Sequence, residues 1–142
     1  NLNGPSVQID GHAWEGKGAK DLTASGEAFE NQGIALDPPA DGDRARMIRS
    51  SIYSRDGSSV SLSGVPPGRY QVYLHVWEDN NAQTFDLFVK GKLVQSRYCS
   101  GAGGHWDRLG PWTVDVADGG IDLRASAGDA NFSGLEVWRI FR

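Results

Sequence analysis

Hydrophobic and polar residues alternate most regularly in the middle of the chain. In residues 70–77 apolar side chains occupy every second position, the pattern of a β-strand with two different faces. The alternation stops at the polar run 78–81 and resumes in 84–89. A glycine turn then leads into an apolar pair at 93–94. The pattern predicts a meander of three antiparallel strands, with residues 78–81 as the polar loop between the first two.

Shorter alternations predict further strands on both sides of this segment. They lie in residues 7–9, in one or two places within 21–37, in 45–53, in 60–62, in a hairpin formed by 112–116 and 121–125, and in 135–141. The last strand is apolar on both faces, which favours a central place in a sheet. No internal repeat or convincing amphipathic helix is visible. About eight to ten short strands, with turn signals every 8 to 12 residues, predict an all-β sandwich of two antiparallel sheets.

Composition supports one all-β domain that spans residues 1–142. The chain has 19 glycines and 6 prolines, as many short strands and tight turns require. No stretch approaches the roughly 20 apolar residues of a membrane-spanning helix, so no membrane insertion is expected. The net charge of −4 supplies no basic field for a nucleic acid. The single cysteine, Cys99, excludes an intrachain disulfide and a cysteine-built metal site.

Residues for catalysis do not converge in the sequence. The three histidines, His12, His75 and His105, are scattered, and no nucleophile elbow accompanies them. The one set that could assemble a small hydrolase or lyase is His105, Asp107 and Glu78. We therefore expect a binding module rather than an enzyme.

Residues for sugar binding are present where loops are expected. An aromatic ring can stack on the apolar face of a pyranose, and carboxylates and amides can bond its hydroxyls in fixed directions. The candidate platforms are Tyr53, Trp77 and Trp106, and the candidate polar partners are Glu78, Asp79, Asn80, Asn81 and Asp129. In the alternative interpretation Trp77 closes one end of the core and the acidic loop is only solvated. Trp14, in a glycine-bracketed loop, is either a lid over the core or a ligand platform.

One loop carries three carboxylates that could hold calcium. Asp37, Asp41 and Asp43 lie in a proline-stiffened segment, and calcium prefers oxygen ligands. The spacing does not match the twelve-residue helical calcium loop, and a solvated turn explains these residues as well. No cofactor is required, and calcium is the one metal that these residues could hold, with a solvated turn as the preferred interpretation.

Three segments together resemble the malectin-like domain, a relative of the galactose-binding-like modules. They are GRYQVYLHVWE at 68–78, TFDLFVKG at 84–91 and ANFSGLEV at 130–137. The likeness covers roughly residues 47–138. It implies a jelly-roll β-sandwich that binds carbohydrate through loops at one end, using aromatic platforms and an aspartate.

The resemblance also implies roles for particular residues. Tyr53 is similar to the family's upstream tyrosine, residues 78–81 to the loop after the long strand, and Asp129 to the late aspartate. Asp79-Asn80-Asn81 stands where malectin places an aromatic pair, so stacking would come from Trp77, Trp106 or Trp14. These loops must then meet at one rim of the sandwich.

The expected function is a non-catalytic carbohydrate-binding module. It would be appended to the catalytic module of a larger secreted polysaccharide-active protein, at an extracellular or cell-surface location, with a polysaccharide or oligosaccharide as partner. The alternative is a protein-interaction or adhesion domain that uses the same loops.

Overall fold

The computed structural model describes residues 1–126 and 128–141 and places twelve strands and one short helix in them. The elements are β1 (Val7–Ile9), β2 (His12–Trp14), β3 (Leu22–Ser25), β4 (Glu27–Glu30), α1 (Gly42–Ile48), β5 (Ser50–Tyr53), β6 (Ser59–Leu62), β7 (Gly68–Trp77), β8 (Thr84–Val89), β9 (Lys92–Cys99), β10 (Trp106–Val116), β11 (Ile121–Ala125) and β12 (Asn131–Arg139). The prediction of an all-β sandwich is confirmed.

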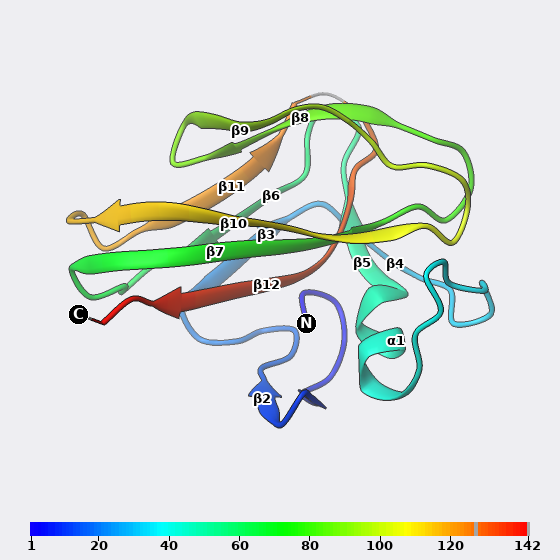
Figure 1. Cartoon of the computed structure of the whole chain (residues 1–142), viewed down its shortest axis with the longest axis horizontal. Helices are drawn as coiled ribbons and strands as arrows, with labels where there is room; N and C mark the ends of the chain where they lie inside the picture. Colours follow the sequence, from blue (N-terminus) through cyan, green and yellow to red (C-terminus); the bar gives the residue numbers. More distant parts are fainter. Residues whose placement is uncertain (127, 142) are drawn as a thin grey trace.

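Two five-stranded antiparallel sheets form the body of the molecule (Figure 1). The front sheet has the strand order β10-β7-β12-β5-β4, and the back sheet has the order β3-β6-β11-β8-β9. The longest strands, β7, β10 and β12, are neighbours in the front sheet. β12 lies at the centre of that sheet, as its two apolar faces predicted.

The main core lies between the two sheets and uses the even positions of β7. Val72, Leu74 and Val76 are at most 1% exposed and pack with apolar residues of the back sheet such as Leu87 and Leu123. These positions point inward because successive side chains of a strand alternate between its faces. The even-numbered face predicted from the sequence is therefore the core face.

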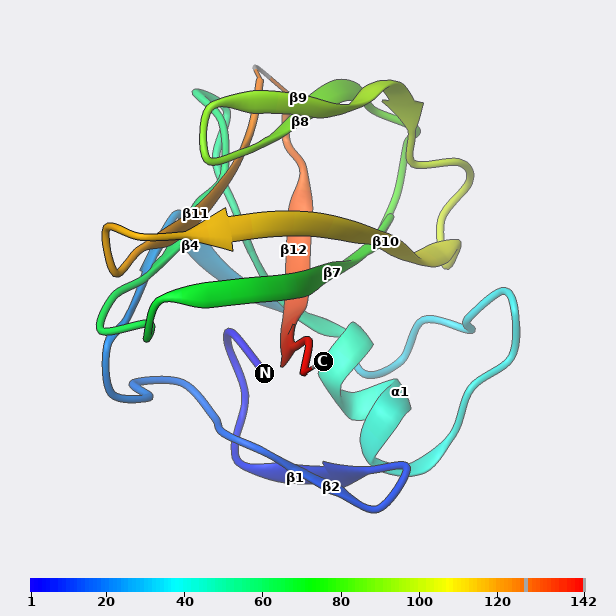
Figure 2. The ribbon, with the colours of Figure 1, turned by 60° about the vertical axis from the view of Figure 1, so that its left-hand side comes forward.

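A third layer covers the outer face of the front sheet. It consists of the β1–β2 hairpin and α1, which lie on the side of this sheet away from β8 and β9 (Figure 2). A second apolar cluster joins this layer to the sheet, with Ile9 from the hairpin, Met47 and Ile48 from the helix and Trp77 from β7. The odd positions of β7 thus face a partly covered surface rather than open solvent.

Three sequence predictions about elements are wrong. β7 and β8 do not pair, because the polar loop between them crosses from the front sheet to the back sheet; only β8 and β9 form the expected hairpin. β10 and β11 likewise belong to different sheets instead of forming a hairpin. The start of the predicted strand 45–53 belongs to α1, a helix of seven residues that is too short to show a clear helical period.

No helix in the described ranges 1–126 and 128–141 is long and apolar enough to cross a membrane.

Candidate functional site

A groove on the outer face of the front sheet gathers aromatic and charged side chains. It has a volume of about 350 Å³. We call it the tryptophan groove, and it is lined by Ile9, Asp10, His12, Trp14, Arg44, His75, Trp106, Arg108, Glu136 and Trp138. The hairpin and α1 supply one wall, and the strands β7, β10 and β12 supply the floor and the other wall.

Strand register explains why residues distant in the sequence meet here. His75 of β7 lies opposite Arg108 of β10 on one side and Gly134 of β12 on the other. Glu136 and Trp138 follow Gly134 at intervals of two, so they share its face. That face is opposite to the one that Val72 and Leu74 bury between the sheets.

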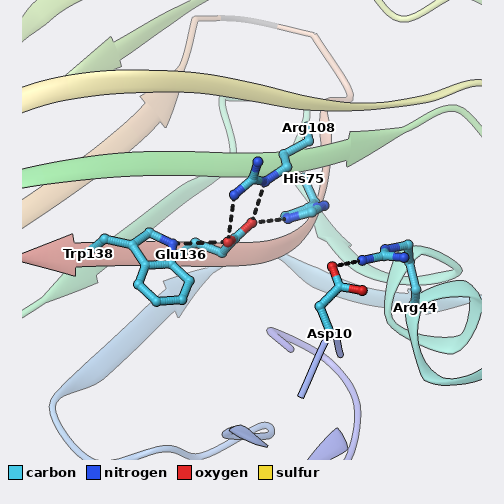
Figure 3. A network of polar contacts seen from close by, with 6 residues as sticks. All are labelled: Asp10, Arg44, His75, Arg108, Glu136 and Trp138. Atoms are coloured by element: carbon cyan, nitrogen blue, oxygen red, sulfur yellow. Dashed lines mark hydrogen bonds and ion pairs between the residues drawn. The ribbon is translucent and has the colours of Figure 1, made fainter. Parts of the chain in front are cut away.

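Glu136 organises the polar floor of the groove (Figure 3). One of its oxygens, Oε2, lies 2.7 Å from Nε2 of His75 and accepts a 2.7 Å hydrogen bond from Nε of Arg108. The other, Oε1, accepts bonds from the Arg108 NH2 group at 2.9 Å and from the indole nitrogen of Trp138 at 3.0 Å. One carboxylate therefore fixes the orientation of three side chains.

These contacts keep Glu136 ionised. Burial by itself raises the pKa of a carboxyl group, because it penalises the charged form. The hydrogen bonds from His75, Arg108 and Trp138 and the nearby charge outweigh burial, so the pKa of Glu136 lies far below its usual range. A carboxylate that is ionised in this way accepts hydrogen bonds and donates none.

Aromatic rings form the sides of the groove. Trp14 meets the ring of His75 edge to face, with centroids 5.4 Å apart, and His12 meets Trp138 in the same way at 4.8 Å. Trp106 donates its indole hydrogen to the carbonyl of Pro38 at 2.7 Å. Trp14 and Trp106 are half-buried, whereas Trp138 is 40% exposed. The Trp138 ring is therefore free to contact a ligand.

An ion pair between Asp10 and Arg44 forms part of the wall that faces Glu136 (Figure 3). Asp10 belongs to the turn between β1 and β2, and Arg44 belongs to α1. The pair therefore links the hairpin to the helix beside the groove. Every arginine in the lining has a carboxylate partner.

The sequence-predicted loops do lie at one end of the sandwich. β5 and β7 are both antiparallel to β12, so the end of β5 at Tyr53, the end of β7 and the start of β12 share an edge. The Asn131 side chain donates a hydrogen bond to Asp79 at 2.8 Å. The hydrogen bond with Glu27 and the charges of Glu27 and Asp129 raise the pKa of Tyr53.

The rim formed by Tyr53, Asp79, Asn80, Asn81 and Asp129 is largely open to solvent. Asn80 and Asn81 are exposed and the other three are partly exposed. The Tyr53 hydroxyl bonds to Glu27 at 2.7 Å, and one carboxylate oxygen of Asp129 is buried without a hydrogen-bond partner among the described residues. None of the five lines the tryptophan groove. Their role in binding stays a prediction.

Two predicted contact residues are buried with their polar atoms already paired, and neither lines the tryptophan groove. Trp77 is 1% exposed, stacks on Phe29 and donates its indole hydrogen to Ser51 at 3.0 Å. Glu78 is 2% exposed and accepts a 2.6 Å hydrogen bond from Ser100. Both predictions are wrong because the third layer and the loop before β10 cover the end of β7. The alternative, in which Trp77 closes part of the core, is the observed one.

The groove combines one predicted platform with residues that the sequence analysis placed elsewhere. Trp106 was predicted and lines it, and Trp14 serves both as a lid and as a lining residue. Trp138, Glu136 and Arg108 were not predicted as site residues. The alternation in β12 put Glu136 and Trp138 on one face, but no sequence signal showed that β7 and β10 lie beside it.

The proposed calcium loop does not assemble in the structure. Within residues 1–126 and 128–141, no three His, Cys, Asp or Glu side chains are grouped so that they could hold a metal ion. Asp43 instead accepts hydrogen bonds from the backbone of Gln8 and from Arg46. Asp41 precedes α1, and Asp37 pairs through its backbone with His105 and Trp106. This geometry gives calcium at Asp37, Asp41 and Asp43 no support.

The set considered for catalysis is partly assembled. Nε2 of His105 lies 3.5 Å from Asp107, but Asp107 also accepts the hydroxyl hydrogen of Tyr98. Glu78 is buried and accepts a hydrogen bond from Ser100, and burial raises the pKa of its carboxyl group. The three side chains therefore do not open together onto a groove that could hold a substrate.

Comparisons with known proteins show the fold. No protein-family model matches the chain, and no curated protein sequence matches it. A plant receptor-like kinase, ANX2, is similar in structure with a TM-score of 0.75 and 15% identity, over 98% of this chain and 46% of that one. The ANXUR1 extracellular domain from Arabidopsis thaliana matches with a TM-score of 0.73 and 13% identity, over 98% and 46% of the two chains.

A bacterial enzyme contains a similar unit. The β-glucuronidase of Bacteroides uniformis matches with a TM-score of 0.74 and 17% identity, over 93% of this chain and 16% of the enzyme. The chain therefore spans less than half of each of these proteins. Such likenesses show the fold alone, and they are consistent with the malectin-like sandwich that the sequence resemblance implied.

Proposed function

We propose that the chain is a non-catalytic carbohydrate-binding module that holds sugar in the tryptophan groove. The observation that carries the proposal is the arrangement of three indole rings around a polar network whose central carboxylate, Glu136, is only 10% exposed. Sugar rings need both features, since their C–H faces stack on aromatic rings and their hydroxyls need oriented hydrogen-bond partners.

Trp138 is the main platform in this proposal. Its ring is 40% exposed, and the hydrogen bond to Glu136 together with the contact to His12 holds the ring in place. A platform that is already fixed loses little conformational entropy when a ligand binds. Groove sites with one or two platforms reach affinities of roughly micromolar to millimolar, which suffices when a module only concentrates its protein on a polymer.

A second hollow continues the groove on the other side of Trp138. It measures about 370 Å³ and shares His12, Trp14, Glu136 and Trp138 with the first. Two hollows that share a platform suit neighbouring units of one glycan chain. We therefore propose an oligosaccharide or polysaccharide as the ligand rather than a free monosaccharide.

The rim at the end of β5 and β7 is proposed as a second place of contact. Tyr53, Asp79, Asn80, Asn81 and Asp129 offer a ring, amides and carboxylates, as the malectin-like resemblance requires. The wider setting is also part of the proposal: a larger secreted, polysaccharide-active protein that acts outside the cell. Support for that setting is the similar unit within a bacterial glucuronidase and within plant receptor ectodomains.

A protein-interaction domain is the second candidate function. Besides Trp138, the large apolar side chains of Leu93 and Phe141 are exposed, at 54% and 81%. Exposed apolar side chains mark protein contacts when they form one continuous patch. Leu93 and Trp138 belong to different sheets, so a protein ligand at the groove would use Trp138 with Phe141, whereas a sugar would use Trp138 without Phe141.

Replacing Trp138 tests the proposal. We expect Trp138→Ala to weaken binding of the best ligand from a glycan array at least ~10-fold, about 1.4 kcal/mol, because the stacking surface is lost. Phe141→Ala, which removes another exposed aromatic ring outside the groove, should leave affinity unchanged. Isothermal titration calorimetry with the same oligosaccharide measures both variants.

The rim variants decide between the two places of contact. Tyr53→Ala and Asp129→Ala should change affinity less than Trp138→Ala does if the groove is the main site. Equal affinity for Trp138→Ala and the unaltered protein would contradict the groove assignment, and full loss in the rim variants would move the site to the rim. An array without any bound glycan would contradict carbohydrate binding altogether.

A further inference from the structure

One polar atom at the floor of the tryptophan groove has no partner. His75 is 3% exposed, and its Nδ1 is buried without a hydrogen-bond partner among the described residues. Buried polar atoms are normally paired, so an exception in a residue that lines a groove indicates a partner that comes from outside. Because Nδ1 is itself buried, such a partner reaches it only after a side chain that covers it moves. His75 is one of the residues that line this groove.

The network around Glu136 decides what this atom can do. Glu136 is ionised and accepts bonds from Arg108 and Trp138, so it also accepts the hydrogen on Nε2 of His75. A neutral imidazole with its hydrogen on Nε2 has a bare lone pair on Nδ1. In this neutral form the atom without a protein partner among the described residues is a hydrogen-bond acceptor, and a hydroxyl group is a suitable donor.

The charges in the groove favour a ligand without charge. Two arginines and two carboxylates line it, and they pair as Arg108 with Glu136 and Arg44 with Asp10. A sugar carboxylate would find no unpaired cation in this lining and would lie near two negative groups. A sugar amine would meet two guanidinium groups. The volume of about 350 Å³ lies at the lower end of the range for small-molecule sites, roughly 300–1,000 Å³.

We propose that the groove binds a neutral hexopyranose unit, one hydroxyl of which donates a hydrogen bond to Nδ1 of His75. The inference rests on the proposed function and names the sugar class and the recognising atom. Trp138 and Trp14 supply ring contacts, and Glu136 is the positioning residue that sets the tautomer of His75. Selectivity against uronic acid sugars follows from the paired arginines.

Imidazole nitrogen NMR tests the proposal on the unaltered protein. Methyl glycosides of glucose, galactose and mannose are added at up to tens of millimolar, and long-range proton–nitrogen spectra follow the three histidines. We expect the chemical shift of His75 Nδ1 to change when at least one of these neutral glycosides is added. The change should reach its plateau at the glycoside concentration that saturates binding. The signals of His105, which lies outside the lining, should stay in place.

Matched acidic sugars test the selectivity. Methyl glucuronide and methyl galacturonide differ from the neutral glycosides only in the carboxylate at C6, and we expect them to bind at least ~10-fold more weakly. Equal or tighter binding of the uronides would overturn the charge argument.

A variant supplies an independent readout. His75→Phe removes the acceptor and leaves Glu136 bound to Arg108 and Trp138. Deoxy analogues of the bound glycoside, each lacking one hydroxyl, are titrated against both proteins. For the unaltered protein, one deoxy analogue should bind about tenfold more weakly than the parent glycoside. For His75→Phe, the same analogue and the parent glycoside should bind equally well.

The outcomes separate this inference from the proposed function. A glycoside that binds without moving the Nδ1 signal of His75 overturns the inference and leaves carbohydrate binding intact. Failure of every methyl glycoside and every glycan on an array to bind overturns both. Because the NMR measurement needs no substitution, a His75→Phe protein that fails to fold does not affect the decision.

Discussion

At the scale of single residues, Glu136 is the centre of the polar network in the tryptophan groove. Its two oxygens accept or share hydrogen bonds with His75, Arg108 and Trp138, and its side chain is only 10% exposed. Arg108 also lies over the ring of Tyr73, with 3.6 Å between the guanidinium carbon and the ring centroid. Removing the charge of Glu136 should therefore disturb the whole polar floor.

We expect Glu136→Gln to lower stability by about 1–3 kcal/mol at neutral pH, since charge-assisted hydrogen bonds are lost. The pKa of Glu136 is lowered from 4.5 on folding, so the contribution of its charge is fully present above pH 4.5 and declines as the pH falls. Urea unfolding of both proteins between pH 3 and 7 measures this. The stability difference should shrink below pH 4.5, and a difference that stays constant would contradict the assigned pKa direction.

Single residues show where sequence reasoning succeeds and where it stops. The polar run 78–81 was correctly recognised as a loop that starts at the end of the long strand, and Asp79 does meet the start of β12 at Asn131. Trp77, at the end of the strand, and Glu78, at the start of the loop, were predicted as ligand contacts, but both are buried. Alternation identifies which face a side chain is on, yet it cannot say whether a further layer covers that face.

At the scale of elements, β12 carries the groove because Gly134 lets other side chains approach it. A Cβ at this position would lie 2.8 Å from the sulfur of Met47 and 2.9 Å from Cζ3 of Trp14. Contacts between a Cβ and other heavy atoms under 3.0 Å essentially do not occur, so both side chains would have to move. The absence of a side chain at Gly134 thus positions Trp14 beside His75.

We expect Gly134→Ala to cost about 1–3 kcal/mol of stability through overpacking and to weaken glycan binding by displacing Trp14. Gly120→Ala is the matched control, because a Cβ there would meet nothing closer than the Leu62 carbonyl oxygen at 3.8 Å. Urea unfolding and calorimetric titration follow the two variants. A Gly134→Ala protein as stable as the control would contradict this role of Gly134.

Elements were predicted better than their partners. Eleven of the twelve strands in the described residues fall within or beside predicted segments, because period-two alternation is a local signal; β2 falls in the glycine-bracketed loop. Pairing depends on which loop crosses between sheets, and the β7–β8 and β10–β11 connections both cross. Helix α1 was missed because its buried Ala45, Met47 and Ile48 are too few to show a helical period.

At the scale of the molecule, the largest buried side chain between the third layer and the sandwich is that of Trp77. Trp77 comes from the front sheet and belongs to the apolar cluster of the hairpin and helix. We expect Trp77→Ala to cost about 3–5 kcal/mol, a large share of the 5–15 kcal/mol that domains typically have. Trp138→Ala, at an exposed indole, should cost less than about 1 kcal/mol in the same urea unfolding experiment. Equal losses of stability in the two variants would contradict this difference between a buried and an exposed tryptophan.

The candidate site could be predicted only in part, because alternation along the sequence does not show which elements lie side by side. Family resemblance pointed to the rim, whose residues are contiguous with conspicuous motifs. The tryptophan groove draws on five separated segments: the hairpin, α1 and the strands β7, β10 and β12. Their adjacency arises only after the sheets have formed.

The hairpin and helix that wall the groove precede the long strands in the chain and rest on a body that has its own core. One wall of the groove is thus encoded apart from the long strands, which carry Trp138, Glu136 and His75. Substitutions at Asp10, His12 and Trp14 can redirect what the protein captures while the sandwich beneath keeps its interior unchanged, so this short N-terminal stretch is the natural place to engineer, or for evolution to alter, ligand choice.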